Sequence, residues 1–176
     1  MWLLFRRGLA SIAVGCGHGV SFLTIAMVAV MFTSTLMSQL FNINFIALQE
    51  SVTWLHAAVF MLGAAYTLQR NEHVRVDIFY SKFSPRTQAI VDILGTLLFL
   101  FPMCGFILYS SISFVELSWR LSEGSAEAGG LPGVFLLKTL IWVMPVLIMI
   151  EGLNQILRNI DQWRHSSNHT NTEVPL

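Results

Sequence analysis

Ionisable side chains inside apolar stretches are the residues of this sequence that could most readily carry chemistry. Glu50, Glu116 and Lys138 are predicted near one end of these stretches, and Asp92 and Glu151 near the other end. Such groups are rare in membrane-spanning segments and commonly mark ion or substrate pathways. None of them is expected at the middle of a stretch, where a proton-coupled carrier would place its carboxylate. Pairing between neighbouring helices, such as Glu116 with Lys138, is therefore the favoured interpretation.

The histidines and cysteines do not indicate a haem, metal or redox site. His18 is predicted near the inner end of the first helix, and His56 is predicted near the outer end of the second helix. At about 1.5 Å of rise per residue they differ in depth by more than roughly 10 Å, too far for axial ligands of one haem. Cys16 and Cys104 lie in apolar runs without a CxxC pattern. Because a nucleophile–base constellation and a phosphate loop are also missing, we predict no enzymatic activity, no catalytic residue, no cofactor and no metal.

The composition indicates an integral membrane protein. Of 176 residues, 55% are hydrophobic and only 11% are charged, whereas soluble domains carry about 25% charge. A spanning helix needs about 20 predominantly apolar residues, and the charge-free runs at 8–49, 51–69, 93–115 and 139–150 are the cores of such helices. We predict an all-α membrane protein with four long, tilted transmembrane helices at about residues 9–37, 45–69, 86–118 and 131–158.

Small residues crowd the first half of the first predicted helix. Glycine occurs at positions 8, 15, 17 and 19. Small residues let helix backbones approach closely in lipid, so we predict a packing surface, within the chain or against a partner. The sequence Ala13-Val14-Gly15-Cys16 resembles a weak lipoprotein cleavage site. The apolar run continues far beyond Cys16, which favours an uncleaved signal-anchor helix.

A short amphipathic segment lies between the second and third predicted helices. Its apolar residues recur at i, i+3, i+4 and i+7, as on one face of a helix: Val76, Phe79, Tyr80 and Phe83. Because it is too short to span, we predict an interfacial helix at about residues 76–84. Ser84 and Pro85 are typical of an N-cap and first helical position. Pro102 is predicted to kink the third helix.

The charge distribution predicts how the helices are oriented in the membrane. Basic loops resist translocation, and the bend after the second helix is the most basic loop: it carries Arg70, Arg75, Lys82 and Arg86. With both termini inside, eight of the ten basic residues face the cytoplasm. We predict an N-in, C-in arrangement, with one integral membrane domain at residues 1–160 and a polar, disordered cytoplasmic tail at 161–176.

The loop between the third and fourth predicted helices, residues 119–130, carries two acidic residues, Glu123 and Glu127. It is rich in small residues, which predicts flexibility. On the predicted topology it faces the outside. Two interpretations stay open: the loop is part of a docking surface for another protein, or it is a solvated connector.

Several motifs together resemble the small membrane subunit of a tripartite ATP-independent periplasmic (TRAP) transporter. The resemblance covers residues 50–158, whereas the first helix matches only in character. Glu151-Gly152 replaces the glutamine–glycine pair that is frequent in relatives. The matching residues are Glu50, the block Gly63-x-x-Tyr66-x-x-x-Arg70-x-x-His73-Val74-Arg75-Val76-Asp77, Glu116-x-Ser118, Gly130-Leu131-Pro132, Lys138 and Pro145.

The resemblance implies a multi-pass subunit of a secondary active importer in the bacterial inner membrane. In that family a periplasmic binding protein captures an organic anion, and a large membrane subunit carries it by an elevator motion driven by a sodium gradient. The small subunit is a scaffold that binds the large one obligatorily, with an arm helix parallel to the membrane. Its candidate structural or interface residues are Glu50, Arg70, His73, Arg75, Asp77, Glu116 and Lys138. The segment Gly130-Leu131-Pro132-x5-Lys138 leans towards the branch named for mannitol and chloroaromatic substrates, without identifying a substrate.

An alternative is a four-helix anchor or assembly subunit of a membrane enzyme complex. Neighbouring genes for a large permease and an exported binding protein would favour transport. Haem absorbance in a purified complex would favour the anchor. The sequence does not identify the ion stoichiometry or whether two complexes associate.

Overall fold

The chain is described here from a computed structural model, which describes the backbone of residues 2–70, 80 and 83–169. Side chains are described for these residues except 2–14, 16, 18, 85 and 162–169. The predicted all-helical fold is confirmed, because the regular elements of the described residues are all helices, with no strand among them. Its elements are α1 (Trp2–Phe41), α2 (Ile46–Gln69), α4 (Pro85–Gly95), the π-helical segment η1 (Thr96–Leu100), α5 (Phe101–Arg120) and α6 (Val134–His169).

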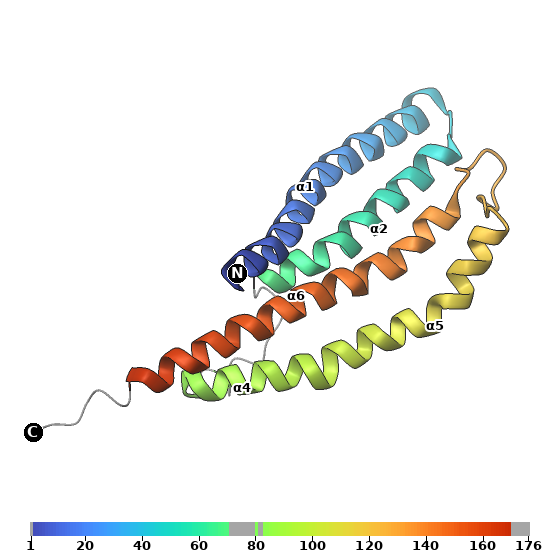
Figure 1. Ribbon diagram of the computed structural model, residues 1–176. Coiled ribbons are helices and arrows are strands. Elements are labelled where there is room, and N and C mark those ends of the chain that lie inside the picture. The colour runs from blue at the N-terminus through green and yellow to red at the C-terminus, as the bar shows by residue number, and fades with distance from the viewer. Residues whose placement is uncertain (1, 71–79, 81–82, 170–176) are drawn as a thin grey trace, which may run out of the picture.

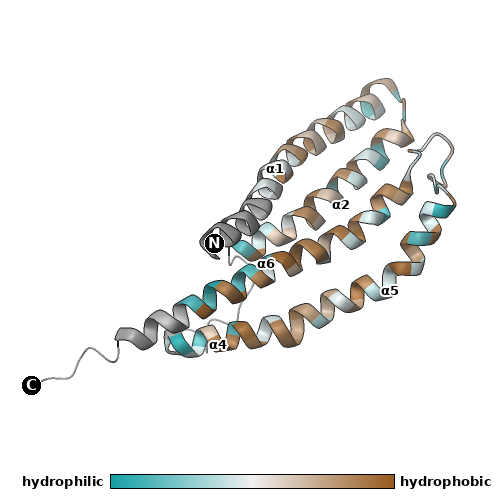
Figure 2. Cartoon of the chain, in the orientation of Figure 1, coloured by the Kyte–Doolittle hydropathy of each residue, from teal (hydrophilic) through white to brown (hydrophobic). Residues whose placement is uncertain are grey.

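Four helical stretches are long and apolar enough to cross a membrane, as predicted. They are Gly19–Phe41, Ile46–Gln69, Arg86–Arg120 and Val134–Asp161. Hydrophobic residues run along α2, α5 and the first part of α6, whereas hydrophilic residues gather at the start of α4 and the later part of α6 (Figure 2). The predicted interfacial helix at residues 76–84 lies almost entirely outside the described residues.

The helices lie side by side in the order α1, α2, α6 and α4–η1–α5 (Figure 1). α6 is the central element, because it packs against α2, α4, η1 and α5 and also contacts α1. The start of α1, the end of α2, the start of α4 and the later part of α6 share one end of the bundle, called here the α4 end. The α1–α2 and α5–α6 connections share the opposite end, called here the loop end. Both termini therefore lie towards the same end, while the side of the membrane that this end faces stays a prediction.

Helix boundaries differ from the predicted ones mainly where polar residues continue a helix. α6 runs to His169, so the first part of the predicted disordered tail is helical. The prediction followed loss of hydrophobicity, but no glycine or proline occurs between Leu153 and His169 to end the helix. α1 ends at Phe41 because Asn42 adopts a left-handed φ of 56°. The Ile43 N–H then bonds back to the Met37 carbonyl at 3.2 Å, as in a helix C-cap.

The third spanning helix begins at the predicted N-cap, and it contains an irregular segment beside Pro102. Ser84 is the N-cap of α4 and accepts a hydrogen bond from the Thr87 N–H at 3.3 Å, with Pro85 at the first turn. The π segment η1 lies immediately before Pro102, and the Phe101 N–H bonds to the Thr96 carbonyl. Because proline has no N–H to continue the α pattern, the helix changes register there, and the helix is curved rather than straight (Figure 1).

The α1–α2 contact depends on one glycine of the predicted small-residue surface. A Cβ atom at Gly17 would lie 2.6 Å from the Tyr66 ring, so only glycine admits this ring. Gly15 and Gly19 are exposed, and a Cβ at either would meet no atom within 4 Å. Of the two predicted alternatives, packing within the chain does not apply to Gly15 and Gly19, and packing against a partner stays a prediction. Only the helix rotation decides which of the closely spaced glycines faces α2.

Candidate functional site

The clearest convergence of motif residues lies at the loop end. Glu50, in the first turns of α2, accepts a hydrogen bond from the Leu131 backbone N–H through Oε2 at 2.6 Å. Its other carboxylate oxygen accepts from the Ser125 hydroxyl. The sequence had marked Glu50 as a candidate structural or interface residue without indicating its partner. The structure gives this side chain a specific role, since it holds the α5–α6 loop on the start of α2.

Gly130 makes the approach of the loop to Glu50 sterically feasible. A Cβ atom there would lie 2.6 Å from Ser125 Cβ and 2.8 Å from Glu50 Oε1. These distances are shorter than ordinary non-bonded contacts, so any side chain would push the loop away from the carboxylate. The Gly130-Leu131 motif and Glu50 are therefore parts of one structural unit, although they are far apart in the sequence.

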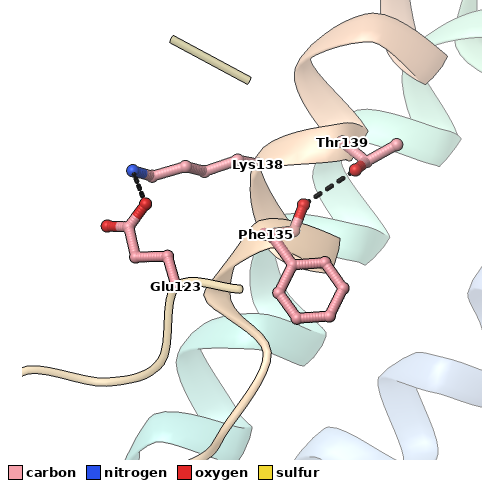
Figure 3. A network of polar contacts seen from close by, with 4 residues as sticks. All are labelled: Glu123, Phe135, Lys138 and Thr139. Atoms are coloured by element: carbon pink, nitrogen blue, oxygen red, sulfur yellow. Dashed lines mark hydrogen bonds and ion pairs between the residues drawn. The ribbon is translucent and has the colours of Figure 1, made fainter. Parts of the chain in front are cut away.

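Lys138 fixes the other side of the same loop. Its Nζ atom lies 2.5 Å from Glu123 Oε2 (Figure 3). The same atom lies 4.0 Å from the centre of the Phe114 ring. The predicted pairing of Glu116 with Lys138 is wrong: Glu116 pairs with Arg120 one turn later, at 2.5 Å. The hydrogen bond from Lys138 holds the pKa of the Glu123 carboxyl below its usual value.

Contacts of aromatic side chains join α5 to α6 next to the loop. Trp119 donates its indole N–H to Thr139 Oγ1 at 2.9 Å, and its ring meets Phe135 edge to face at 4.7 Å. Trp142 donates to Ser111 Oγ at 3.1 Å. Thr139 itself donates to the Phe135 carbonyl at 2.7 Å (Figure 3). The loop is thus fastened at several points, whereas Glu127 remains exposed.

The basic bend, the strongest part of the family resemblance, is only partly described. Arg70 is exposed at the end of α2, and its guanidinium lies 5.1 Å from the centre of the Tyr66 ring. His73, Arg75 and Asp77 lie outside the described residues, so their structural roles stay predictions. The next described residue is Tyr80, and its hydroxyl donates a hydrogen bond to Asp92 Oδ2 at 2.9 Å.

A row of buried polar residues on α6 was not recognised from the sequence. Glu151 is only 1% exposed, and both its carboxylate oxygens lie 3.2 Å from Asn154 Nδ2. Asn159 lies 3.5 Å from Asp92 Oδ2, and Gln155 is also buried. The four positions are related by i, i+3, i+4 and i+8, which places them on one helix face. This spacing was the signal that could have identified the row.

The described side chains do not form a metal site, because no group of three or more His, Cys, Asp or Glu among them could hold an ion. The fold and the loop-end contacts of the described residues define the class: an integral membrane protein with four spanning helices and an α5–α6 loop that is held in place by side-chain contacts. The family model named "Tripartite ATP-independent periplasmic transporters, DctQ component" matches residues 27–162. The chain belongs to this family, which favours the transporter over the enzyme anchor. No curated protein and no solved structure matches the chain.

Proposed function

We propose that this chain is a scaffold subunit that does not itself carry substrate, within a sodium-driven importer of organic anions. The proposal rests on the family assignment and on the contacts that the charged side chains make at the loop end. Glu50, Glu123 and Lys138 are all engaged in contacts that hold the chain's own loop. Charged groups engaged in this way stabilise a fixed shape. Transport in the proposed complex belongs to the large membrane subunit, with a periplasmic protein delivering the substrate.

The side-by-side arrangement of the helices (Figure 1) leaves apolar side chains exposed on α1 and α5, which supports an extensive contact with the large subunit. α1 and α5 carry large, exposed apolar side chains, such as Phe22, Phe32 and Phe106. In a bilayer such side chains contact lipid or another membrane protein, and van der Waals packing of this kind contributes to association between spanning helices. We assign part of this surface to the large subunit, which would stabilise a chain with few buried apolar residues of its own.

The proposed orientation places the α4 end in the cytoplasm and the pinned loop in the periplasm. Its support is the concentration of Arg and Lys near the α4 end, because basic segments resist translocation. With this orientation the exposed Glu127 faces the compartment of the binding protein. We further propose that Arg75 and Asp77 of the basic bend set the direction of the interfacial arm.

The test is reconstitution of transport from purified components. Vesicles would contain the chain alone, the large subunit alone or both, with substrate presented on the cognate binding protein. The substrate would first be found by ligand screening of that binding protein. We expect uptake only with all three proteins and an inward sodium gradient. Uptake by vesicles that contain this chain without the large subunit would overturn the scaffold role.

A further inference from the structure

A groove of about 600 Å³ opens between the third spanning helix and α6. Gly95, Phe99, Met103 and Ile107 contribute to one wall, and Met144 and Ile148 to the other. Among the described lining residues, the hydroxyl, carboxyl and amide side chains lie towards the α4 end of the groove: Tyr80, Asp92, Thr96 and Gln155. The groove therefore changes from polar to apolar along the direction of the helices.

The groove ends partway along the bundle. Beyond Ile107 and Met144 the same seam is closed by the hydrogen bond from Trp142 to Ser111. Further towards the loop end, Trp119 bonds to Thr139 across the two helices. A whole spanning helix of a partner would have to lie across this closed part of the seam. A shorter ligand fits in the open part alone.

The length of the groove corresponds to one leaflet of a bilayer. The span Val134–Asp161 has 28 residues; at about 1.5 Å per residue it measures about 42 Å, close to the full thickness of a bilayer with its headgroups. Gln155 lies about 9 Å inside the end of this span, near the boundary of headgroups and hydrocarbon. Met144 lies about 16 Å deeper, and half of the hydrocarbon core is about 15 Å.

Gln155 lies at the polar end of the groove and has no side-chain hydrogen bond to another described residue. The residue is only 5% exposed, and it lines the groove. Within the described part of the chain its carboxamide makes no hydrogen bond, in contrast to Asn154 and Asn159 on the same face. An amide that is largely shielded from water is stabilised by a ligand that accepts its hydrogen bond. The geometry calls for a ligand with a hydrogen-bond acceptor at this depth.

We propose that the groove binds one acyl chain of a glycerophospholipid from the leaflet at the α4 end. The acyl chain lies along Phe99, Met103 and Met144. An ester carbonyl of the lipid accepts a hydrogen bond from Gln155 Nε2. The polarity of the groove complements that of the lipid: polar atoms face the ester region, and apolar atoms face the hydrocarbon. A helix of a protein partner fits less well, because the seam closes at half the thickness of the membrane.

The experiment uses the full chain in phosphatidylcholine vesicles that include phosphatidylcholine with a diazirine in the middle of one acyl chain. After irradiation, the labelled peptides are identified by mass spectrometry. We expect labelling at residues 99–107 and 144–148 to exceed that at the exposed α1 residues Phe22 and Phe32. Gln155→Met, which removes one hydrogen bond, should weaken retention of the lipid through detergent purification by about fivefold.

A matched pair of glycine variants separates occupancy of the groove from general effects of substitution. A Cβ at Gly95 or at Gly105 would meet no atom within 4 Å, but only Gly95 lines the groove. Gly95→Leu should fill the groove and abolish the excess labelling, whereas Gly105→Leu should preserve it. Equal labelling of the groove and of α1, or full labelling in Gly95→Leu, would overturn the proposal.

The same measurement is repeated on the complex with the large subunit. If the same peptides are still labelled, a bound lipid is supported. If the label is lost and position 103 cross-links to the large subunit, the groove is assigned to a protein helix and the proposal is overturned. Because labelling does not depend on uptake, the result is independent of the proposed transport function.

Discussion

Glu50 and Leu131 are 81 positions apart in the chain, and the Glu50 carboxylate accepts the Leu131 backbone N–H at 2.6 Å. This bond joins the start of α2 to the loop that precedes α6. Together with the Ser125 hydroxyl, it places a charged acceptor beneath a tight loop. The α5–α6 loop is consequently a defined surface whose shape depends on the Glu50 carboxylate, and this dependence can be tested by substitution.

Glu50→Gln should lower the Tm of the purified chain, because the neutral amide is a weaker acceptor and brings an NH₂ group near the Ser125 hydroxyl. Thermal unfolding in detergent measures the effect. Glu127→Gln is the matched control, since the side chain of Glu127 is exposed on the same loop. Equal Tm values for the two variants would contradict a structural role for Glu50.

Gly130→Ala should destabilise the chain by about 1–3 kcal/mol, the usual cost of overpacking. The added Cβ would lie 2.8 Å from Glu50 Oε1. Gly124→Ala is the control, because a Cβ there would meet its nearest neighbour, Pro132 Cα, at 3.9 Å. Denaturant unfolding of both variants checks this prediction, and an unaffected Gly130→Ala variant would show that the loop yields without cost.

The Glu123–Lys138 pair predicts a loss of stability in acid. The pKa of Glu123 is lowered from 4.5 in the folded chain, chiefly by the hydrogen bond from Lys138. The unfolded chain therefore takes up the proton first, and the contribution of the pair is complete above pH 4.5 and lost as the pH falls through the folded pKa. Glu123→Gln should remove this component from a profile of Tm against pH. An identical profile in the variant would exclude the pair as its source.

Docking of the binding protein is tested best at Glu127. Charge reversal at Glu123 would also break its contact with Lys138, whereas Glu127 has an exposed side chain. If the loop is a docking surface, Glu127→Lys should slow uptake more at low salt than at high salt, because salt screens charges beyond about 10 Å at 0.1 M. An unchanged rate at low salt would leave the loop a connector.

Gly17→Leu should separate α1 from α2, because the Tyr66 ring occupies the space of the new side chain. We expect a loss of at least about 1–3 kcal/mol and poor recovery of the folded chain in size-exclusion chromatography. Gly15→Leu should leave the isolated chain unaffected, because its Cβ meets nothing within 4 Å. If Gly15→Leu impairs only assembly with the large subunit, this face of α1 belongs to the partner contact.

The sequence alone determined the helices and the family of this protein. Long charge-free runs, the Ser84-Pro85 start and Pro102 are local features, and each acts on the backbone within a few residues of its position. Hydrophobicity of this length leaves hardly any alternative to spanning helices, since backbone groups in lipid must be bonded within the segment. The family motifs could be recognised from the sequence without a structure.

Tertiary structure decided which side chains meet. Lys138 pairs with Glu123 rather than Glu116, Gly17 rather than Gly15 packs on α2, and Glu50 bonds to a loop that is distant in the sequence. Such contacts depend on the rotation and depth of each helix relative to its neighbours. A uniformly apolar helix carries little information about its rotation, because most of its faces are equally suited to lipid or to protein.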